Sequence, residues 1–178
     1  TGIITTMRKI FRTTDILTVV CLVAVACAMR ILLFSGFVLG DDPAYADYVS
    51  RILREGYPRI GPHAVFACRP IMLYAIALPI YLFGWQEWSF VLPVLIASLI
   101  NTVLVYWAGK RMGGYPAGVL AAVAYMTFPL DAVHATTLSN DILLSTFVWG
   151  GVCLLFAAGE RRGGSSVALS GLAGCITG

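Results

Sequence analysis

Charged side chains are scarce in this chain, and their scarcity excludes a soluble domain. Only 12% of the 178 residues are Asp, Glu, Lys or Arg, whereas 59% are hydrophobic and the mean hydropathy is +0.86. A soluble domain carries about 25% charged residues. The few basic residues stand in separate clusters and form no continuous face, which argues against nucleic acid as a partner. The composition therefore predicts an all-α integral membrane protein, built as a polytopic helix bundle.

Cysteine is also used sparingly, in positions that fit neither a disulfide framework nor a zinc site. Four of the 5 cysteines lie inside apolar runs, where they act as small hydrophobic residues. No small-residue cleavage site follows the first apolar run, which is also too long for a signal peptide. The last apolar run, from Val167, is too short to span a membrane. We therefore expect the chain to be the N-terminal part of a longer protein.

The apolar runs and the basic clusters together predict the topology. The apolar segments are Ile16–Leu39, Ile71–Phe83, Trp88–Ala108, Tyr115–Leu130, Ile142–Ala158 and the run from Val167. Basic clusters precede the first segment and follow the third and the fifth, and such clusters mark the cytoplasmic side. If all three clusters are cytoplasmic, an even number of crossings separates them, so one of the first three segments does not span. The short one, Ile71–Phe83, begins after Pro70 and contains Pro79. We predict four complete crossings and the start of a fifth, with the N-terminus in the cytoplasm.

On this topology, residues 1–178 form one transmembrane module and residues 40–87 form a large first outer loop. The loop is expected to carry two interfacial helices, an amphipathic one over Pro43–Gly56 and the apolar segment Ile71–Phe83. A tight turn from Asp131 to Asp141 should face the same outer side. The polar residues expected to converge there are Asp41, Asp42, Arg69, Asp131, His134 and Asp141.

Asp41 and Asp42 are the first candidates for chemistry, because a carboxylate pair at the mouth of a membrane helix is costly unless it binds something. One interpretation is helix capping, which Pro43 in the first turn would suit. The other is a general base, because a carboxylate near apolar walls can take a proton from a nucleophile. In that case the second carboxylate would orient the first or hold a divalent cation.

Arg69 and Arg30 are the candidate phosphate ligands. Arg69 opens the segment that does not span, where a guanidinium suits a lipid phosphate through two parallel hydrogen bonds or simply anchors at the headgroups. Arg30 lies inside the first crossing, and intramembrane charge points to a functional site. It either faces a wet cavity and a phosphate or pairs with a carboxylate, and both alternatives stay open.

Asp141, His134 and Tyr45 complete the set of candidate substrate-binding residues, which also includes Asp42. Asp141 begins a crossing after Ser139, so it is either part of a helix start or part of the site. His134 is a candidate ligand in the outer turn, although such loop residues are commonly only solvated. Tyr45 is a candidate substrate ligand, although a tyrosine at this position is typically an interfacial anchor.

Four motifs give the chain a likeness to a known family. A spanning helix leads into Gly40-Asp41-Asp42-Pro43-Ala44-Tyr45-Ala46 and a surface helix that ends at Gly56. The other three are Arg69-Pro70-Ile71-Met72-Leu73-Tyr74 closing on Phe83-Gly84, Tyr106 to Gly113 with its Lys-Arg pair, and Ser139-Asn140-Asp141-Ile142-Leu143-Leu144. In this order they resemble the GT-C glycosyltransferases over residues 8 to 162. The branch they resemble is protein-mannosyltransferase-like and includes the aminoarabinose transferases of lipid A.

The resemblance implies a catalytic base at Asp41 and a polyprenyl-phosphate-linked sugar as the donor. It also implies transfer to a lipid, glycan or protein hydroxyl on the outer face of the membrane. In bacteria this membrane would be the cytoplasmic (inner) membrane. Some relatives place a Glu, as a metal ligand, where this chain has Cys68. A divalent cation therefore stays an open alternative, with Asp42 or Asp141 as its candidate ligand.

Two functions compete at this point. The first is an inverting glycosyltransferase of the GT-C type, or its N-terminal module. The second is a non-catalytic membrane subunit of a larger complex that keeps the fold. A transporter is disfavoured, because the charges gather at one membrane face and not at mid-membrane.

Overall fold

The computed structural model describes residues 13–37, 41–57 and 69–159, and within these ranges every regular element is an α-helix. The elements are α2 (Thr13–Leu32), α3 (Asp42–Glu55), α5 (Pro70–Phe83), α6 (Glu87–Thr127), α7 (Pro129–His134) and α8 (Asn140–Gly159). Three of them, α2, α6 and α8, are long and apolar enough to cross a membrane. The predicted all-α membrane fold is confirmed.

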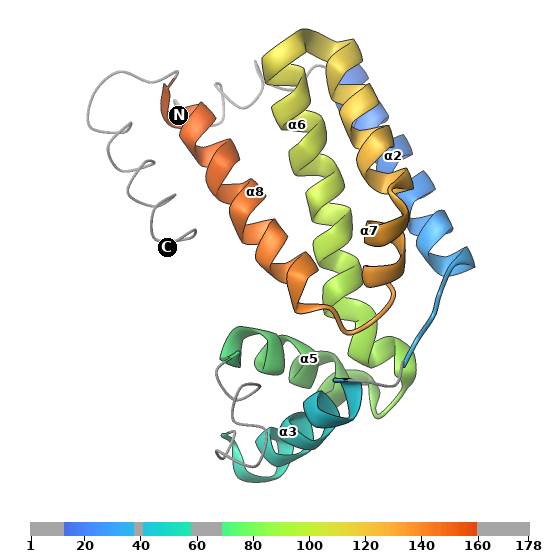
Figure 1. Ribbon diagram of the computed structural model, residues 1–178, viewed down its shortest axis with the longest axis vertical. Helices are drawn as coiled ribbons and strands as arrows, with labels where there is room; N and C mark the ends of the chain where they lie inside the picture. Colours follow the sequence, from blue (N-terminus) through green and yellow to red (C-terminus); the bar gives the residue numbers. More distant parts are fainter. Residues whose placement is uncertain (1–12, 38–40, 58–68, 160–178) are drawn as a thin grey trace.

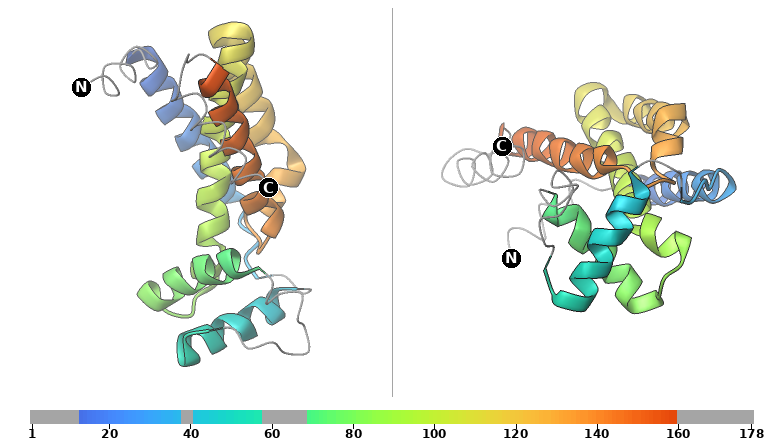
Figure 2. Two further views of the ribbon diagram at one scale, coloured as in Figure 1. Left: turned by 90° about the vertical axis from the view of Figure 1, so that its left-hand side faces the viewer. Right: turned by 60° about the horizontal axis from the view of Figure 1, so that its bottom comes forward.

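The long helices stand side by side as a bundle, and α3 and α5 lie across one end of it (Figures 1 and 2). The start of α2 lies at the opposite end, where Lys110 pairs with Asp15 at 2.7 Å. Tyr106 donates a hydrogen bond to the same carboxylate oxygen at 2.9 Å. We call this the kink end, because α6 bends there, and we call the end with α3 and α5 the cavity end.

Helix α6 is two limbs joined by a reversal at the kink end. Gly113 and Gly114 leave the helical conformation, and Gly114 has a φ of 79°, which favours glycine. The second limb then returns along the first (Figure 1). A Cβ on Gly118 would lie 2.8 Å from the Tyr106 carbonyl oxygen, so only glycine permits this approach of the two backbones. The separate segments predicted at Trp88–Ala108 and Tyr115–Leu130 correspond to the two limbs.

The first crossing is shorter than its apolar run. The sequence predicts it over Ile16–Leu39, whereas α2 ends at Leu32. Residues 33–37, which follow α2, form a strap at the cavity end of the bundle. Gly36 in this strap has a φ of 70°, and its backbone N–H donates to the Thr136 carbonyl at 3.1 Å, so the strap is bonded to the segment before α8. The crossing thus ends where the backbone of Gly36 bonds to that of Thr136, 100 residues later in the chain, and a hydropathy profile cannot predict such a contact.

The expected tight turn between Asp131 and Asp141 is also incorrect in part. Phe128 is extended, with a ψ of 119°, which separates α7 from the second limb of α6. Pro129 suits the first turn of the new helix, because it has no N–H to leave unpaired. Residues 129–134 are therefore helical, and only residues 135–139 connect α7 to α8.

The two short helices form a layer of their own. In α3 the buried residues Tyr45, Tyr48, Val49 and Ile52 follow helical spacing, and they face buried residues of α5 such as Leu73 and Ile76. At about 1.5 Å per residue, the 14 residues of α5 are too short to span a bilayer. Helix α5 packs in turn against α6, which holds this layer on the bundle.

Candidate functional site

A cavity of about 550 Å³ opens at the cavity end, between the start of α3 and the connection from α7 to α8. Ten of its twelve lining residues have polar side chains, among them three carboxylates, one guanidinium and one imidazole. The lining residues are Ser35, Asp41, Asp42, Tyr45, Arg69, Val133, His134, Thr137, Leu138, Ser139, Asn140 and Asp141. The structure thus gathers the candidate site residues here except Arg30, and it also leaves out Asp131, which was expected in the same cluster.

The start of α3 places the two adjacent carboxylates differently. Asp41 is the N-cap, and its backbone carbonyl accepts hydrogen bonds from Ala44 and Tyr45 at 3.0 and 3.1 Å. Its carboxylate makes no capping hydrogen bond and is exposed. Asp42 begins the helix itself and is only 6% exposed. Capping therefore does not occupy the side chain of Asp41, and of the two adjacent carboxylates it is the exposed one.

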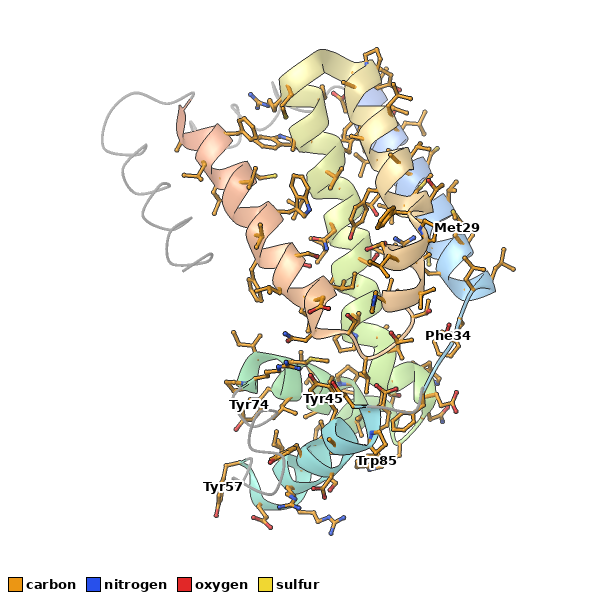
Figure 3. The ribbon with its side chains drawn as sticks, in the orientation of Figure 1. Met29, Phe34, Tyr45, Tyr57, Tyr74 and Trp85 are labelled. Atoms are coloured by element: carbon orange, nitrogen blue, oxygen red, sulfur yellow. The ribbon has the colours of Figure 1, made fainter. Side chains whose placement is uncertain are left out.

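Tyr45 and Arg69 form one unit on the floor of the cavity. Arg69 Nη1 donates a hydrogen bond to Tyr45 Oη. Tyr45 is 1% exposed, and burial raises the pKa of its phenol although Arg69 opposes that effect. Figure 3 shows Tyr45 where α3 meets α5 below the bundle. Tyr45 is thus a neutral, buried partner that holds the guanidinium, and the anchor interpretation does not describe it.

The opposite wall comes from α7 and α8. His134 lies in the last turn of α7 and is half-buried. Asp141 lies in the first turn of α8 and is exposed. Its helix position agrees with the capping alternative for this segment, and it still lines the cavity. Carboxylate, imidazole and amide groups of this kind suit the hydroxyl groups of a sugar.

Arg30 does not reach the cavity, and its guanidinium is committed elsewhere. It is 0% exposed, and Nη2 pairs with Asp131 Oδ2 at 2.5 Å. Nε donates to Ser98 Oγ at 2.8 Å, and Nη1 donates to the Ala26 carbonyl at 3.2 Å. Of the two alternatives for Arg30, a phosphate or a carboxylate, the structure shows the carboxylate. The expectation that Asp131 belongs to the outer polar cluster is wrong for the same reason.

Sequence reasoning missed the rest of this buried network. Ser98 Oγ donates to Asp131 Oδ2 at 3.1 Å, and Tyr125 Oη donates to Oδ1 at 2.5 Å. Both residues are inside apolar runs, and a hydroxyl in such a run is the one signal that could have drawn attention to them. The sequence does not predict the contact of Asp15 with Lys110 either, because the two residues flank different apolar segments far apart in the chain.

The described residues do not form a ready metal site. Within residues 13–37, 41–57 and 69–159, no three His, Cys, Asp or Glu side chains are grouped so that they could hold an ion. Cys68, which stands where relatives have a ligand, lies outside the described residues. A divalent cation at Asp42 or Asp141 therefore stays a prediction.

Comparison with known proteins places these observations in a family. The sequence model described as "Dolichyl-phosphate-mannose-protein mannosyltransferase" matches residues 63–177, which is more than half of the chain. The matched stretch contains Arg69, His134 and Asp141 and begins after Asp41. No curated protein and no solved structure gives a significant match.

Proposed function

The chain belongs to the dolichyl-phosphate-mannose-protein mannosyltransferase family of GT-C membrane glycosyltransferases, and we propose that its cavity transfers a sugar from a polyprenyl-phosphate donor to a hydroxyl group. The acceptor belongs to a lipid, a glycan or a protein. The observation that carries the proposal is the carboxylate of Asp41, which is exposed, makes no helix-capping hydrogen bond and lines the same cavity as Arg69. A general base and an anion ligand are the two groups that this reaction requires of the protein.

The proposed reaction is a single displacement. Asp41 takes the proton of the acceptor hydroxyl as the oxygen attacks the anomeric carbon of the sugar. The bond between that carbon and the phosphate oxygen breaks on the opposite side, so the anomeric configuration inverts. The phosphate leaves with both electrons of the broken bond, and the Arg69 guanidinium stabilises its negative charge.

Tyr45 supports this role of Arg69 without touching substrate. A guanidinium on a four-bond stem has many conformers, and ordering a long side chain costs up to about 2 kcal/mol of entropy. The hydrogen bond to the buried phenol restricts that freedom before the donor arrives. We expect Arg69 to meet the phosphate with little reorganisation.

The cavity end is proposed to face the outside of the membrane, in bacteria the periplasmic side. Lys110 and Arg111 lie at the kink end, and basic residues are enriched on the cytoplasmic side. The apolar helices and the family support an integral membrane protein. A donor whose lipid tail stays in the bilayer could then present its headgroup to Asp41 and Arg69.

The test compares two carboxylates of the same helix. Asp41→Asn keeps the size of the side chain and removes its basicity, so transfer should fall by about 10²–10⁴-fold, as for loss of a general base. Asp47→Asn is the matched control, because Asp47 is exposed on α3 and pairs with Arg51 at 2.7 Å, away from the cavity lining. It should retain wild-type transfer.

Transfer from a polyprenyl-phosphate mannose would be measured with the full-length protein in bicelles. Equal activity of Asp41→Asn and Asp47→Asn would remove Asp41 as the base. A wild-type protein that binds the donor and transfers nothing to any hydroxyl acceptor would favour the non-catalytic subunit.

A further inference from the structure

We propose that the buried network around the carboxylate of Asp131, to which Arg30, Ser98 and Tyr125 donate, positions one wall of the cavity. This inference rests on the function proposed above and adds residues that do not touch substrate. Arg30 and Asp131 are both absent from the cavity lining. Their effect on the donor would pass through helix α7, which carries His134, and through the connection to Asp141.

The carboxylate of Asp131 is the point where three other segments meet α7. Arg30 reaches it from the end of α2, and Ser98 reaches it from the first limb of α6. Tyr125 reaches it from the second limb of α6. Both carboxylate oxygens are therefore occupied by donors, at 2.5 and 3.1 Å on Oδ2 and at 2.5 Å on Oδ1. Few alternative positions of α7 would satisfy the same three donors.

Helix α7 needs such an anchor because it is short. It has six residues, of which Asp131 and Ala132 are buried, so little apolar surface holds it in place. Isolated helices of this length are unstable in water. A charged hydrogen bond contributes more than a neutral one, and breaking a buried pair leaves an uncompensated charge. Asp131 is thus the strongest fixed point of this helix.

The wall of the cavity follows directly from that fixed point. His134 is one helical turn after Asp131, and residues 137–141 line the cavity immediately beyond. The segment is tied again at Thr136, whose carbonyl accepts the N–H of Gly36 at 3.1 Å. Thr136 Oγ1 also lies within hydrogen-bond distance of the Leu33 carbonyl, at 3.3 Å. A shift of α7 would move both His134 and the strap that carries Ser35.

The chain offers a matched pair of variants for the test. Tyr125→Phe removes the hydroxyl that donates to Asp131 and leaves the ion pair with Arg30 in place. Tyr106→Phe removes a hydroxyl that donates to another buried carboxylate, Asp15, at the kink end. Each variant loses one hydrogen bond to a carboxylate, so both should lose similar stability. Only the first loses it beside the cavity wall.

Binding of farnesyl phosphate to the full-length protein is the main measurement, because a dissociation constant does not depend on the folded fraction. Tyr125→Phe should raise the dissociation constant about tenfold, because the cavity wall that meets the ligand is then less well positioned. Tyr106→Phe should leave it within about twofold of wild type. Equal dissociation constants for the two variants would overturn the positioning role.

A second measurement needs neither ligand nor turnover. A Val133→Cys variant, in a background without other cysteines, reacts with a maleimide at a rate that depends on how exposed this position of α7 is. That rate should change when Tyr125→Phe is added and stay constant when Tyr106→Phe is added. An unchanged rate in both would contradict the inference. If wild type fails to bind farnesyl phosphate while the maleimide rates differ as expected, the proposed function fails and the positioning of α7 stands.

Discussion

The close packing of the two α6 limbs makes a sharp stability prediction at Gly118. An added Cβ would lie 2.8 Å from the Tyr106 carbonyl oxygen and 2.9 Å from Lys110 Cβ. The first of these is a backbone atom, which cannot rotate away, so the limbs must separate. Overpacking of this kind typically costs about 1–3 kcal/mol. Alanine is the better helix former and recovers about 0.5–1 kcal/mol. Gly118→Ala should therefore destabilise the protein by about 1 kcal/mol net, with an upper bound of about 2.5 kcal/mol.

Gly150 in α8 supplies the control, because a Cβ there would meet nothing within 4 Å. Gly150→Ala keeps only the gain in helix propensity and should stabilise by about 0.5–1 kcal/mol. The free energy of unfolding would be measured by steric trapping in bicelles for both variants. Changes of the same sign and size would show that the limbs are not held together by this backbone contact.

Two further predictions concern the cavity end. Arg69→Lys keeps the charge but loses the planar fork of donors. It should therefore weaken farnesyl phosphate binding nearly as much as Arg69→Ala does, by about 1.5–3 kcal/mol. If both variants bind like wild type, Arg69 is only an interfacial anchor. For the topology, cysteines at Tyr57 and Gln86 flank α5 and are both exposed. Both should react with a reagent confined to the outer face if α5 does not cross, and labelling from opposite faces would refute that topology.

The elements that the sequence predicted best are those that local patterns determine. Helix α3 has helical spacing of its apolar residues and Gly56 at its end, where a φ of 81° favours glycine. The reversal of α6 lies at Gly113 and Gly114, just after Lys110 and Arg111, which already interrupt the apolar run. Each of these features depends on residues within a few positions of one another. Reading the sequence alone is therefore sufficient for them.

The cavity lining could be predicted for a related reason. Asp41, Arg69 and Asp141 each stand at the start of a helix, directly after a turn or a connection. When successive crossings alternate in direction, the end of one helix and the start of the next lie at the same membrane face, so polar residues at these connections gather there. The contact between Tyr45 and Arg69 could not be predicted this way, because it depends on how α3 lies on α5.

The ion pair of Arg30 and Asp131 shows where sequence reasoning ends and why the two arginines differ. The partners are 101 residues apart, and several carboxylates near the cavity end were equally available to Arg30 by topology. What selects Asp131 is depth. Arg30 lies in the last turn of α2, level with Ser98 and Tyr125, and these donors together satisfy a carboxylate that is buried to all but 5% of its side-chain surface. A guanidinium with three such contacts could leave them for a phosphate only by abandoning Asp131 as an uncompensated charge. Arg69 lies at the start of α5 and lines the cavity, and it is therefore the arginine that we propose as the phosphate ligand.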